Sequence, residues 1–405
     1  MKTIENIVLL HAYSRRNSGD GLLVDLSAAL LREAFGARLR LTVVAADPSS
    51  FPEYDDVLPA PVIAPSGLAR VAAAAATACR VVTPAAARLR ERLSQCDLIV
   101  GVGGGYLRAR NGVEAAKLAL GHLVQADAAR AARKPTVYLP QSIGPALSCS
   151  SALSDRAAGR LREALAGFAT VCVRDDRSET FLAGNANVMR MPDLAVLEFA
   201  RSRDAVLAQA AARPHGVRHV ALVLRDAPSW SRPQRERYAQ STRELIALLR
   251  NECRLSFAVQ STGRGNDDAA YYRQLGIGET LPGLRHLLEH DTPDVVVSVR
   301  LHGALESLLH GVPAFHLSYE RKGFGAYGDL AIPRWVANAA DFDASSVVQR
   351  LFAPHALPAF WDATERALAR IAGQRTALIE ILRHAAGTKT MLGHPRRDAQ
   401  RPVEA

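Results

Sequence analysis

Lysine, cysteine and aromatic residues are scarce in this chain of 405 residues, and each scarcity excludes a class of protein. Only five lysines occur, so the net charge of +10 comes from arginines, which are scattered along the sequence, and aromatic residues make up only 6%. Nucleic-acid-binding surfaces cluster their basic residues and place aromatic residues between them, so no nucleic-acid partner is predicted. The five cysteines never form a C-x-x-C pair, which argues against a zinc site and a disulfide framework.

Long hydrophobic runs are also missing. The most apolar stretch, residues 71–79, is rich in alanine, flanked by arginines and far shorter than the roughly 20 residues that a membrane-spanning helix needs. The first residues lack the basic and apolar segments of a signal peptide. We therefore expect a soluble, cytoplasmic protein, whose basic surface and arginine-containing tail are compatible with contact to the inner face of the membrane.

Several motifs with known chemistry are absent. The sequence contains no H-E-x-x-H, no G-x-x-x-x-G-K-[ST] loop and no G-x-S-x-G elbow. Its G-G-G run does not fit the G-x-G-x-x-G pattern of dinucleotide binding. These absences argue against P-loop ATP chemistry, a nicotinamide cofactor and an α/β-hydrolase, and no metal site is predicted.

Short apolar runs alternate with longer helical patterns, which is typical of parallel sheets covered by helices on both faces. The pattern breaks once, so we expect an α/β fold of two Rossmann-like domains facing a cleft, a GT-B-like arrangement. The expected parts are a first domain over residues 1–200, a linker over 201–217, a second domain over 218–386 ending in a long helix, and a disordered tail over 387–405. Strands are expected over residues 7–10, 41–45, 98–102, 136–139, 170–173, 219–224, 255–259, 295–299 and 314–317.

Ligands bind beyond the carboxyl ends of strands in such folds, and polar or glycine residues follow six of the expected strands. In order, they are Asn17 and Asp20, then Gly103, Gly104 and Gly105, then Gln141 and Ser142, then Arg174 and Ser178, then Arg300 and His302, and finally Lys322. Glycines allow a ligand to approach the backbone. An arginine at the end of an apolar strand needs an anionic partner.

Each of these residues also has a purely structural interpretation. Asp20 and Ser178 are good helix caps, the glycines and Gln141 could belong to tight turns, and Asp175 could pair with Arg174 inside the protein. Lys322 could be a solvated surface residue. The pair Arg300 and His302 is harder to explain in this way, because both emerge where one valine-rich strand ends.

Taken in order, these segments resemble the polysaccharide pyruvyl transferase family. Arg-Leu-His-Gly at residues 300–303 is the most specific of them. The matching stretches are residues 17–20, 97–105, 140–145, 174–178, 192–193, 300–303, 311–313 and 319–322. The resemblance implies a GT-B-like fold and transfer of the pyruvyl group of phosphoenolpyruvate to a saccharide as a ketal, with phosphate released. Phosphoenolpyruvate would be a co-substrate, and no separate cofactor is implied.

The residue types suit this chemistry. The resemblance assigns donor binding to Arg174 and Arg300, and arginine forks bind carboxylate and phosphate bidentately. It assigns the proton donor to His302, and an imidazole titrates near neutral pH. Lys322 could assist the departing phosphate. Hydrogen bonds to acceptor hydroxyls or to donor oxygens could come from Asn17, Asp20, Gln141 and Ser142.

Two other functions compete with this interpretation. A GT-B glycosyltransferase would share the cleft but bind a nucleotide sugar. A non-catalytic scaffold of exopolysaccharide assembly would keep the cleft for binding alone, although an intact His302 and both arginines argue against it. The acceptor sugar, the position and stereochemistry of the ketal and the oligomeric state are not encoded in these motifs.

Overall fold

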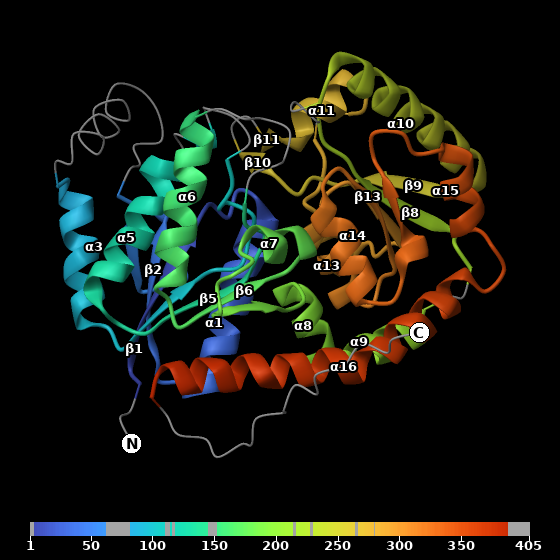
Figure 1. The fold of residues 1–405 in the computed structure, drawn as a ribbon. Helices are drawn as coiled ribbons and strands as arrows, with labels where there is room; N and C mark the ends of the chain where they lie inside the picture. The colour runs from blue at the N-terminus through green and yellow to red at the C-terminus, as the bar shows by residue number, and fades with distance from the viewer. Residues whose placement is uncertain are drawn as a thin grey trace, which may run out of the picture.

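A computed structural model describes residues 4–61, 82–109, 114–115, 118–144, 152–213, 216–226, 230–263, 266–278 and 280–387. It contains two α/β halves, each built around its own parallel sheet, with a long helix running beneath both (Figure 1). The α/β class and the GT-B-like arrangement are therefore confirmed. The expected tail, apart from Gly387, and parts of the segments 48–94 and 226–232 lie outside the described residues.

Within the described part of the chain, the first sheet has seven strands in the order β3-β2-β1-β4-β5-β6-β7. All its pairings are parallel. Its strands are β1 Asn6–Ala12, β2 Arg40–Ala45, β3 Asp56–Pro59, β4 Leu98–Gly101, β5 Thr136–Gln141, β6 Thr170–Val173 and β7 Val188–Arg190. The helices between them are α1 Ser18–Phe35, α3 Pro84–Gln95, α5 Leu123–Ala132, α6 Ala152–Ala166 and α7 Asp176–Phe181.

Among the residues that the structure places, the second sheet has five parallel strands in the order β14-β13-β12-β8-β9. They are β8 His219–Val223, β9 Arg254–Phe257, β12 Val295–Ser298, β13 Ala314–Ser318 and β14 Val336–Asn338. The helices are α10 Arg232–Glu252, α11 Asp268–Gln274, α12 Leu284–His290, α13 Leu301–Leu309, α14 Arg321–Asp329 and α15 Ala344–Leu351. A small hairpin, β10 Thr262–Gly263 and β11 Asn266–Asp267, precedes α11.

Continuous apolar strands form because both faces of each sheet are buried. In β1, Ile7 and Leu9 face one core, with α1, while Val8 and Leu10 face another, with α3 and α5. The cluster that contains Ile7 continues into the second half, where it reaches Val296 of β12. One hydrophobic core therefore joins the two halves and holds them in a defined arrangement.

The connection between the halves is helical. Helix α8 Leu194–Arg201 is followed by α9 Arg203–Ala211, which lies inside the segment 201–217 that we expected as a linker. The long helix α16 Ala356–Ala385 packs against α8 and α1, so it covers the first half as well as ending the second (Figure 1). Arg375 on α16 forms a bidentate pair with Glu33 on α1, at 2.6 Å for both contacts. No helix within the described ranges is long and apolar enough to cross a membrane.

Two helix starts differ from the sequence-based expectation. Helix α1 begins at Ser18, two residues before Asp20, so Asp20 lies in the first turn and Asn17 is the N-cap. Helix α7 is capped by Asp175, whose carboxylate accepts hydrogen bonds from the backbone and hydroxyl of Ser178 at 3.0 and 2.9 Å. The predicted capping roles of Asp20 and Ser178 are therefore wrong. Aspartate at the N-cap position reaches the orphan N–H groups of α7, whereas Ser178 already lies inside its first turn.

Candidate active site

A cavity of about 310 Å³ lies where the carboxyl ends of the two sheets meet. Its walls come from loops after β1, β4 and β6 of the first sheet and after β8, β9, β12 and β13 of the second. Residues from distant parts of the chain meet there because parallel strands end at one edge of a sheet. Of the residues that we predicted for the site, the structure brings eight to this cavity: Asn17, Asp20, Gly104, Gly105, Arg174, Arg300, His302 and Lys322.

Four predicted residues lie behind the cavity instead of lining it. Gly103 packs against Leu194 and Pro140, where a Cβ would lie 3.0 Å from the carbonyl oxygen of Pro140. The side chains of the other three make hydrogen bonds that support the wall. Gln141 Nε2 donates to the carbonyl of Val102 at 2.7 Å, Ser142 Oγ accepts from Arg174 Nε at 3.0 Å, and Ser178 Oγ accepts from the backbone of Ile143 at 2.8 Å.

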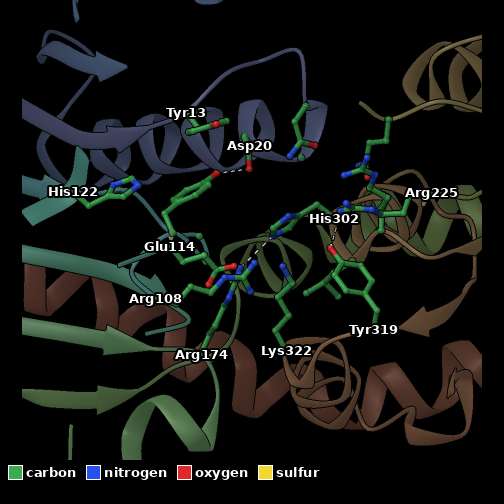
Figure 2. Close-up of a pocket in the computed structure, with 18 of the residues that line it drawn as sticks. Tyr13, Asp20, Arg108, Glu114, His122, Arg174, Arg225, His302, Tyr319 and Lys322 are labelled. Carbon is green, nitrogen blue, oxygen red and sulfur yellow. Dashed lines mark hydrogen bonds between the residues drawn. The ribbon is translucent and has the colours of Figure 1, made fainter. Parts of the chain in front are cut away.

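Arg174, Asp193 and His302 form a buried group that links the two halves. Arg174 Nη1 donates to Asp193 Oδ2, and His302 Nε2 lies 3.3 Å from Arg174 Nη1 and 3.4 Å from Asp193 Oδ2. Neutral His302 can accept from Arg174 through Nε2, and protonated His302 can donate to Asp193. Both protonation states of the imidazole therefore have a partner; Figure 2 shows Arg174 beside His302.

The ion-pair partner of Arg174 is thus Asp193, and the structural alternative of a pair with the adjacent Asp175 is wrong. Asp175 caps α7 and pairs with Arg321 at 2.8 Å. Burial pushes the pKa of Asp193 upward, but the charges of Arg174 and His302 outweigh it and hold that pKa below its ordinary value. Asp193 is therefore ionised at neutral pH and stabilises positive charge on both neighbours.

One nitrogen of Arg174 has no hydrogen-bond partner within the described part of the chain. The side chain is only 2% exposed, yet its Nη2 makes no hydrogen bond to any residue that the structure describes. Gly105 lies beside it, and a Cβ at that position would lie 3.5 Å from Nη2 and 3.9 Å from Lys322 Nζ. A buried donor without an acceptor is unfavourable, so this part of the cavity is suited to an anionic ligand.

The remaining charges around the cavity are mostly positive. Five cationic side chains line it against two carboxylates, those of Asp20 and Glu114; the cations are Arg108, Arg174, Arg225, Arg300 and Lys322. Behind them, Glu320 pairs with Arg108 at 2.6 Å and with Lys322 at 3.2 Å. Burial raises the pKa of Glu320, but the charges of Lys322 and Arg108 hold it below its ordinary value, so these two side chains are fixed by an ionised carboxylate.

Arg300 has a structural partner as well as a place in the cavity wall. Its guanidinium bonds to the buried carboxylate of Asp268, with Nε 3.1 Å from Oδ1. The same carboxylate accepts from the backbone N–H groups of Gln260 and Ser261 at 2.9 and 3.0 Å. Arg300 therefore holds the loop that carries Gln260 to the cavity.

Replacing Arg300 by methionine is expected to lower the free energy of unfolding by about 3–5 kcal/mol, because the buried charge of Asp268 loses its counter-ion. Denaturant unfolding followed by circular dichroism measures this change. The double variant Arg300→Met/Asp268→Asn removes the charge while keeping an oxygen acceptor, and it should recover most of the loss. Equal stability of the single variant and the parent would contradict this account of the pair.

Gly19 allows His302 to approach α1. A Cβ at Gly19 would lie 2.8 Å from Cβ and 3.2 Å from Nδ1 of His302. The nearest atom is the Cβ of His302, which cannot move without moving the ring. Gly19→Ala is therefore expected to displace the imidazole and to lower kcat by about 10-fold or more, while the melting temperature stays nearly unchanged. Gly159→Ala on α6, which meets nothing within 4 Å, is the control. Unaltered kcat in Gly19→Ala would show that the position of the ring is not critical.

The side of the cavity nearest β1 is aromatic. Tyr13, Tyr106 and His122 stack in series, with ring centroids 5.7 and 5.8 Å apart and interplanar angles of 16° for both pairs. Tyr106 also donates its hydroxyl hydrogen to Asp20 Oδ1. We had predicted none of these rings, although Tyr106 directly follows the G-G-G run, which is a signal that could have been used.

Two further residues on the opposite side were also not predicted. Arg225 follows β8, and its Nη1 donates to the hydroxyl of Tyr319 at 3.1 Å. Tyr319 is half-buried, and its loss of hydration raises its pKa, but the charges of Lys322, Arg225 and Arg300 together lower that pKa below its ordinary value despite the opposing charge of Glu320. Figure 2 shows these two residues on one side of His302 and Tyr13 and His122 on the other.

Solved structures with this fold include several sugar-nucleotide enzymes. A UDP-GlcNAc 2-epimerase from Neisseria meningitidis bound to UDP-GlcNAc has a TM-score of 0.53 and 10% identity, covering 94% of this chain and 99% of its own. The UDP-GlcNAc 2-epimerase from Rickettsia bellii has a TM-score of 0.50 and 8% identity, covering 96% and 100%. An α,α-trehalose-phosphate synthase (UDP-forming) from Burkholderia vietnamiensis has a TM-score of 0.51 and 15% identity, covering 95% of this chain and 99% of its own. At these identities the likeness shows the fold alone.

The two parallel sheets and the cavity between their carboxyl ends define a protein of GT-B-like fold, and the cationic lining of the cavity suits an anionic ligand. The model of the polysaccharide pyruvyl transferase family matches residues 17–321, so the chain belongs to that family, as its motifs predicted. No curated protein matches the chain significantly.

Proposed function

We propose that this protein transfers the pyruvyl group of phosphoenolpyruvate to two hydroxyls of a saccharide, forming a ketal and releasing phosphate. The acceptor would be a sugar of a polysaccharide or of its lipid-linked precursor. Phosphoenolpyruvate acts as a co-substrate, and the proposal includes no separate cofactor. Membership of the polysaccharide pyruvyl transferase family supports a transferase, and the rest of the proposal depends on the chemistry of the cavity.

The unpartnered Nη2 of Arg174 is the observation that carries the proposal. This donor is buried, faces Gly105 and Lys322, and belongs to the same arginine whose Nη1 contacts His302. A carboxylate or phosphate oxygen would complete its hydrogen bonding. The bound anion would then lie beside the imidazole, so that the group needing a proton and the group able to supply one are adjacent.

His302 supplies the proton that activates the donor. The enol phosphate of phosphoenolpyruvate becomes electrophilic when its methylene carbon takes a proton, and the electron pair of the C=C bond forms that new C–H bond. Asp193 holds the imidazolium through Nε2, at 3.4 Å, and stabilises its charge before the transfer. The central carbon is left with positive charge, which an acceptor oxygen then attacks.

Protons and charge balance over the whole reaction. The first acceptor hydroxyl bonds to the central carbon and loses a proton, which restores protonated His302. The C–O bond to phosphate breaks with its electron pair on the departing oxygen, and the second hydroxyl bonds in its place. The proton of that second hydroxyl converts the departing group to hydrogen phosphate, whose charge Lys322 and Arg108 stabilise.

Phosphate release from phosphoenolpyruvate, measured against a panel of lipid-linked and nucleotide-linked saccharides, tests this function. We expect release that depends on one class of acceptor, together with a product that gains the mass of a pyruvate ketal. Thermal-shift assays with phosphoenolpyruvate and with UDP, GDP and ADP sugars are the comparison. Stabilisation by a nucleotide sugar, with no phosphate release from phosphoenolpyruvate, would favour a glycosyltransferase and overturn the proposal.

A further inference from the structure

We propose that the aromatic stack of Tyr13, Tyr106 and His122 is the acceptor subsite, and that Asp20 beside it accepts the proton of the attacking sugar hydroxyl. This inference rests on the proposed function and adds which wall of the cavity holds the saccharide. The three rings are called the aromatic wall from here on.

The aromatic wall has one exposed end and one anchored end. Tyr13 is 50% exposed although it lies at the cavity, and large apolar side chains with this exposure are rare among the described residues of this protein. At the other end, His122 Nδ1 lies 3.2 Å from Nδ1 of His11, whose Nε2 lies 2.6 Å from the hydroxyl of Tyr138. The wall is therefore firmly held at its base and open to a ligand at its rim.

The aromatic wall is uncharged, unlike the opposite side of the cavity. Burial lowers the pKa of His122 to about 4, so this imidazole is neutral at physiological pH. Burial, with the charge of Asp20, raises the pKa of Tyr106 well above its ordinary value, so its phenol keeps its proton. A flat neutral surface suits the C–H face of a sugar ring better than it suits a trianion, since aromatic side chains provide apolar contact area with a polar edge.

Asp20 lies between this wall and the proposed proton donor. Its carboxylate accepts from Tyr106, while a Cβ on the preceding residue, Gly19, would lie 3.2 Å from Nδ1 of the His302 imidazole. Burial raises the pKa of Asp20 above its ordinary value against the opposing effects of Tyr106, His302 and Lys322, which come from three different segments. The raised pKa makes the ionised carboxylate a stronger base.

The proton transfer at Asp20 fits the balance of the reaction. The O–H bond of the first acceptor hydroxyl breaks, its proton passes to the Asp20 carboxylate, and its oxygen forms a bond to the central carbon of the donor. His302 has meanwhile given its own proton to the methylene carbon. Protonated Asp20 then returns the proton to His302, so both side chains are ready for the next cycle.

Steady-state kinetics of the full-length protein test the aromatic wall. With the acceptor found in the phosphate-release screen, Tyr13→Ala is expected to raise the KM for the acceptor about tenfold while leaving the KM for phosphoenolpyruvate unchanged. Met189→Ala, which removes an exposed apolar side chain on β7, is the matched control and should change neither value. An unaltered acceptor KM in Tyr13→Ala would overturn the assignment of the wall.

A second pair of variants tests Asp20. Asp20→Asn is expected to lower kcat by about 10²–10⁴-fold. Its affinity for phosphoenolpyruvate, measured by calorimetry, should be unchanged. Asp20→Glu should recover part of the rate. In the parent, kcat should fall as the pH drops through the raised pKa of Asp20, because the base becomes protonated. The residual kcat of Asp20→Asn should not show this fall at low pH. If kcat of the variant falls with pH in the same way as kcat of the parent, the role of Asp20 is overturned.

The outcomes separate this inference from the function on which it rests. A parent protein that binds no saccharide, by saturation-transfer NMR, and releases no phosphate from phosphoenolpyruvate overturns both. A parent that turns over with normal acceptor KM in Tyr13→Ala and normal kcat in Asp20→Asn overturns only the acceptor subsite. Loss of acceptor affinity in Tyr13→Ala with phosphoenolpyruvate binding intact supports it.

Discussion

Replacing His302 by alanine is expected to lower kcat by about 10²–10⁴-fold, the range typical of a lost general acid. Phosphoenolpyruvate affinity and the melting temperature should change little. The fold should survive because Asp193 keeps its ion pair with Arg174 when the imidazole is removed. Phosphate release measures turnover, and calorimetry with phosphoenolpyruvate measures donor binding.

The control for this variant is His286→Ala, which removes an exposed imidazole on α12 and should leave kcat unchanged. Normal phosphate release by His302→Ala would remove the imidazole from the mechanism. A large loss of phosphoenolpyruvate affinity in the same variant would instead assign His302 to donor binding, so the kcat and binding measurements must be made together.

The largest effect on donor binding is expected at Arg174. Arg174→Met should raise the Kd for phosphoenolpyruvate by about 100-fold or more, because an ion held in a buried site loses its hydrogen-bonded counter-ion. The same change should also lower the free energy of unfolding by about 3–5 kcal/mol, since Asp193 is left buried and unpaired. Isothermal calorimetry and denaturant unfolding measure the two effects separately.

A double variant keeps the first effect measurable even if Arg174→Met is too unstable to study. In Arg174→Met/Asp193→Asn the buried negative charge is gone, and the asparagine oxygen can still accept the hydrogen bond of Ala195 that caps α8. Stability should return towards that of the parent while phosphoenolpyruvate binding stays weak. Binding at parental affinity by the double variant would contradict a direct contact between Arg174 and the donor. Arg174→Lys keeps a charge without the planar fork and should fall between these variants.

Much of the fold could be predicted because parallel strands in α/β proteins have continuous apolar sequences. The run His219–Val223 and the valines of β12 are recognisable on composition alone. The carboxyl ends of parallel strands meet at the same edge of each sheet, which is why Arg174 and His302 could be assigned to one site from their positions in the sequence. The resemblance of Arg-Leu-His-Gly to a known family pointed to the same residues, and the family match confirmed the family itself.

Side-chain partners could not be predicted in the same way. Arg174 pairs with Asp193, 19 residues away, and not with the adjacent Asp175, because consecutive residues after a strand point in different directions. The aromatic wall combines Tyr13 from the loop after β1, Tyr106 from the loop after β4 and His122 from the helical turn before α5. The glycine run marks the position of Tyr106, but the sequence contains no local signal for the stacking of the three rings.

The sequence by itself determined which segments become buried strands and which chemical groups stand at their ends, because hydrophobic period and turn chemistry are local properties. Tertiary structure alone decided which of those groups touch. It left Nη2 of Arg174 buried without a hydrogen-bond partner among the described residues, tied Arg300 to Asp268 and separated a cationic side of the cavity from a neutral one. Contacts of this kind depend on how two sheets are placed against each other, and that placement follows from a core shared by residues from both halves of the chain.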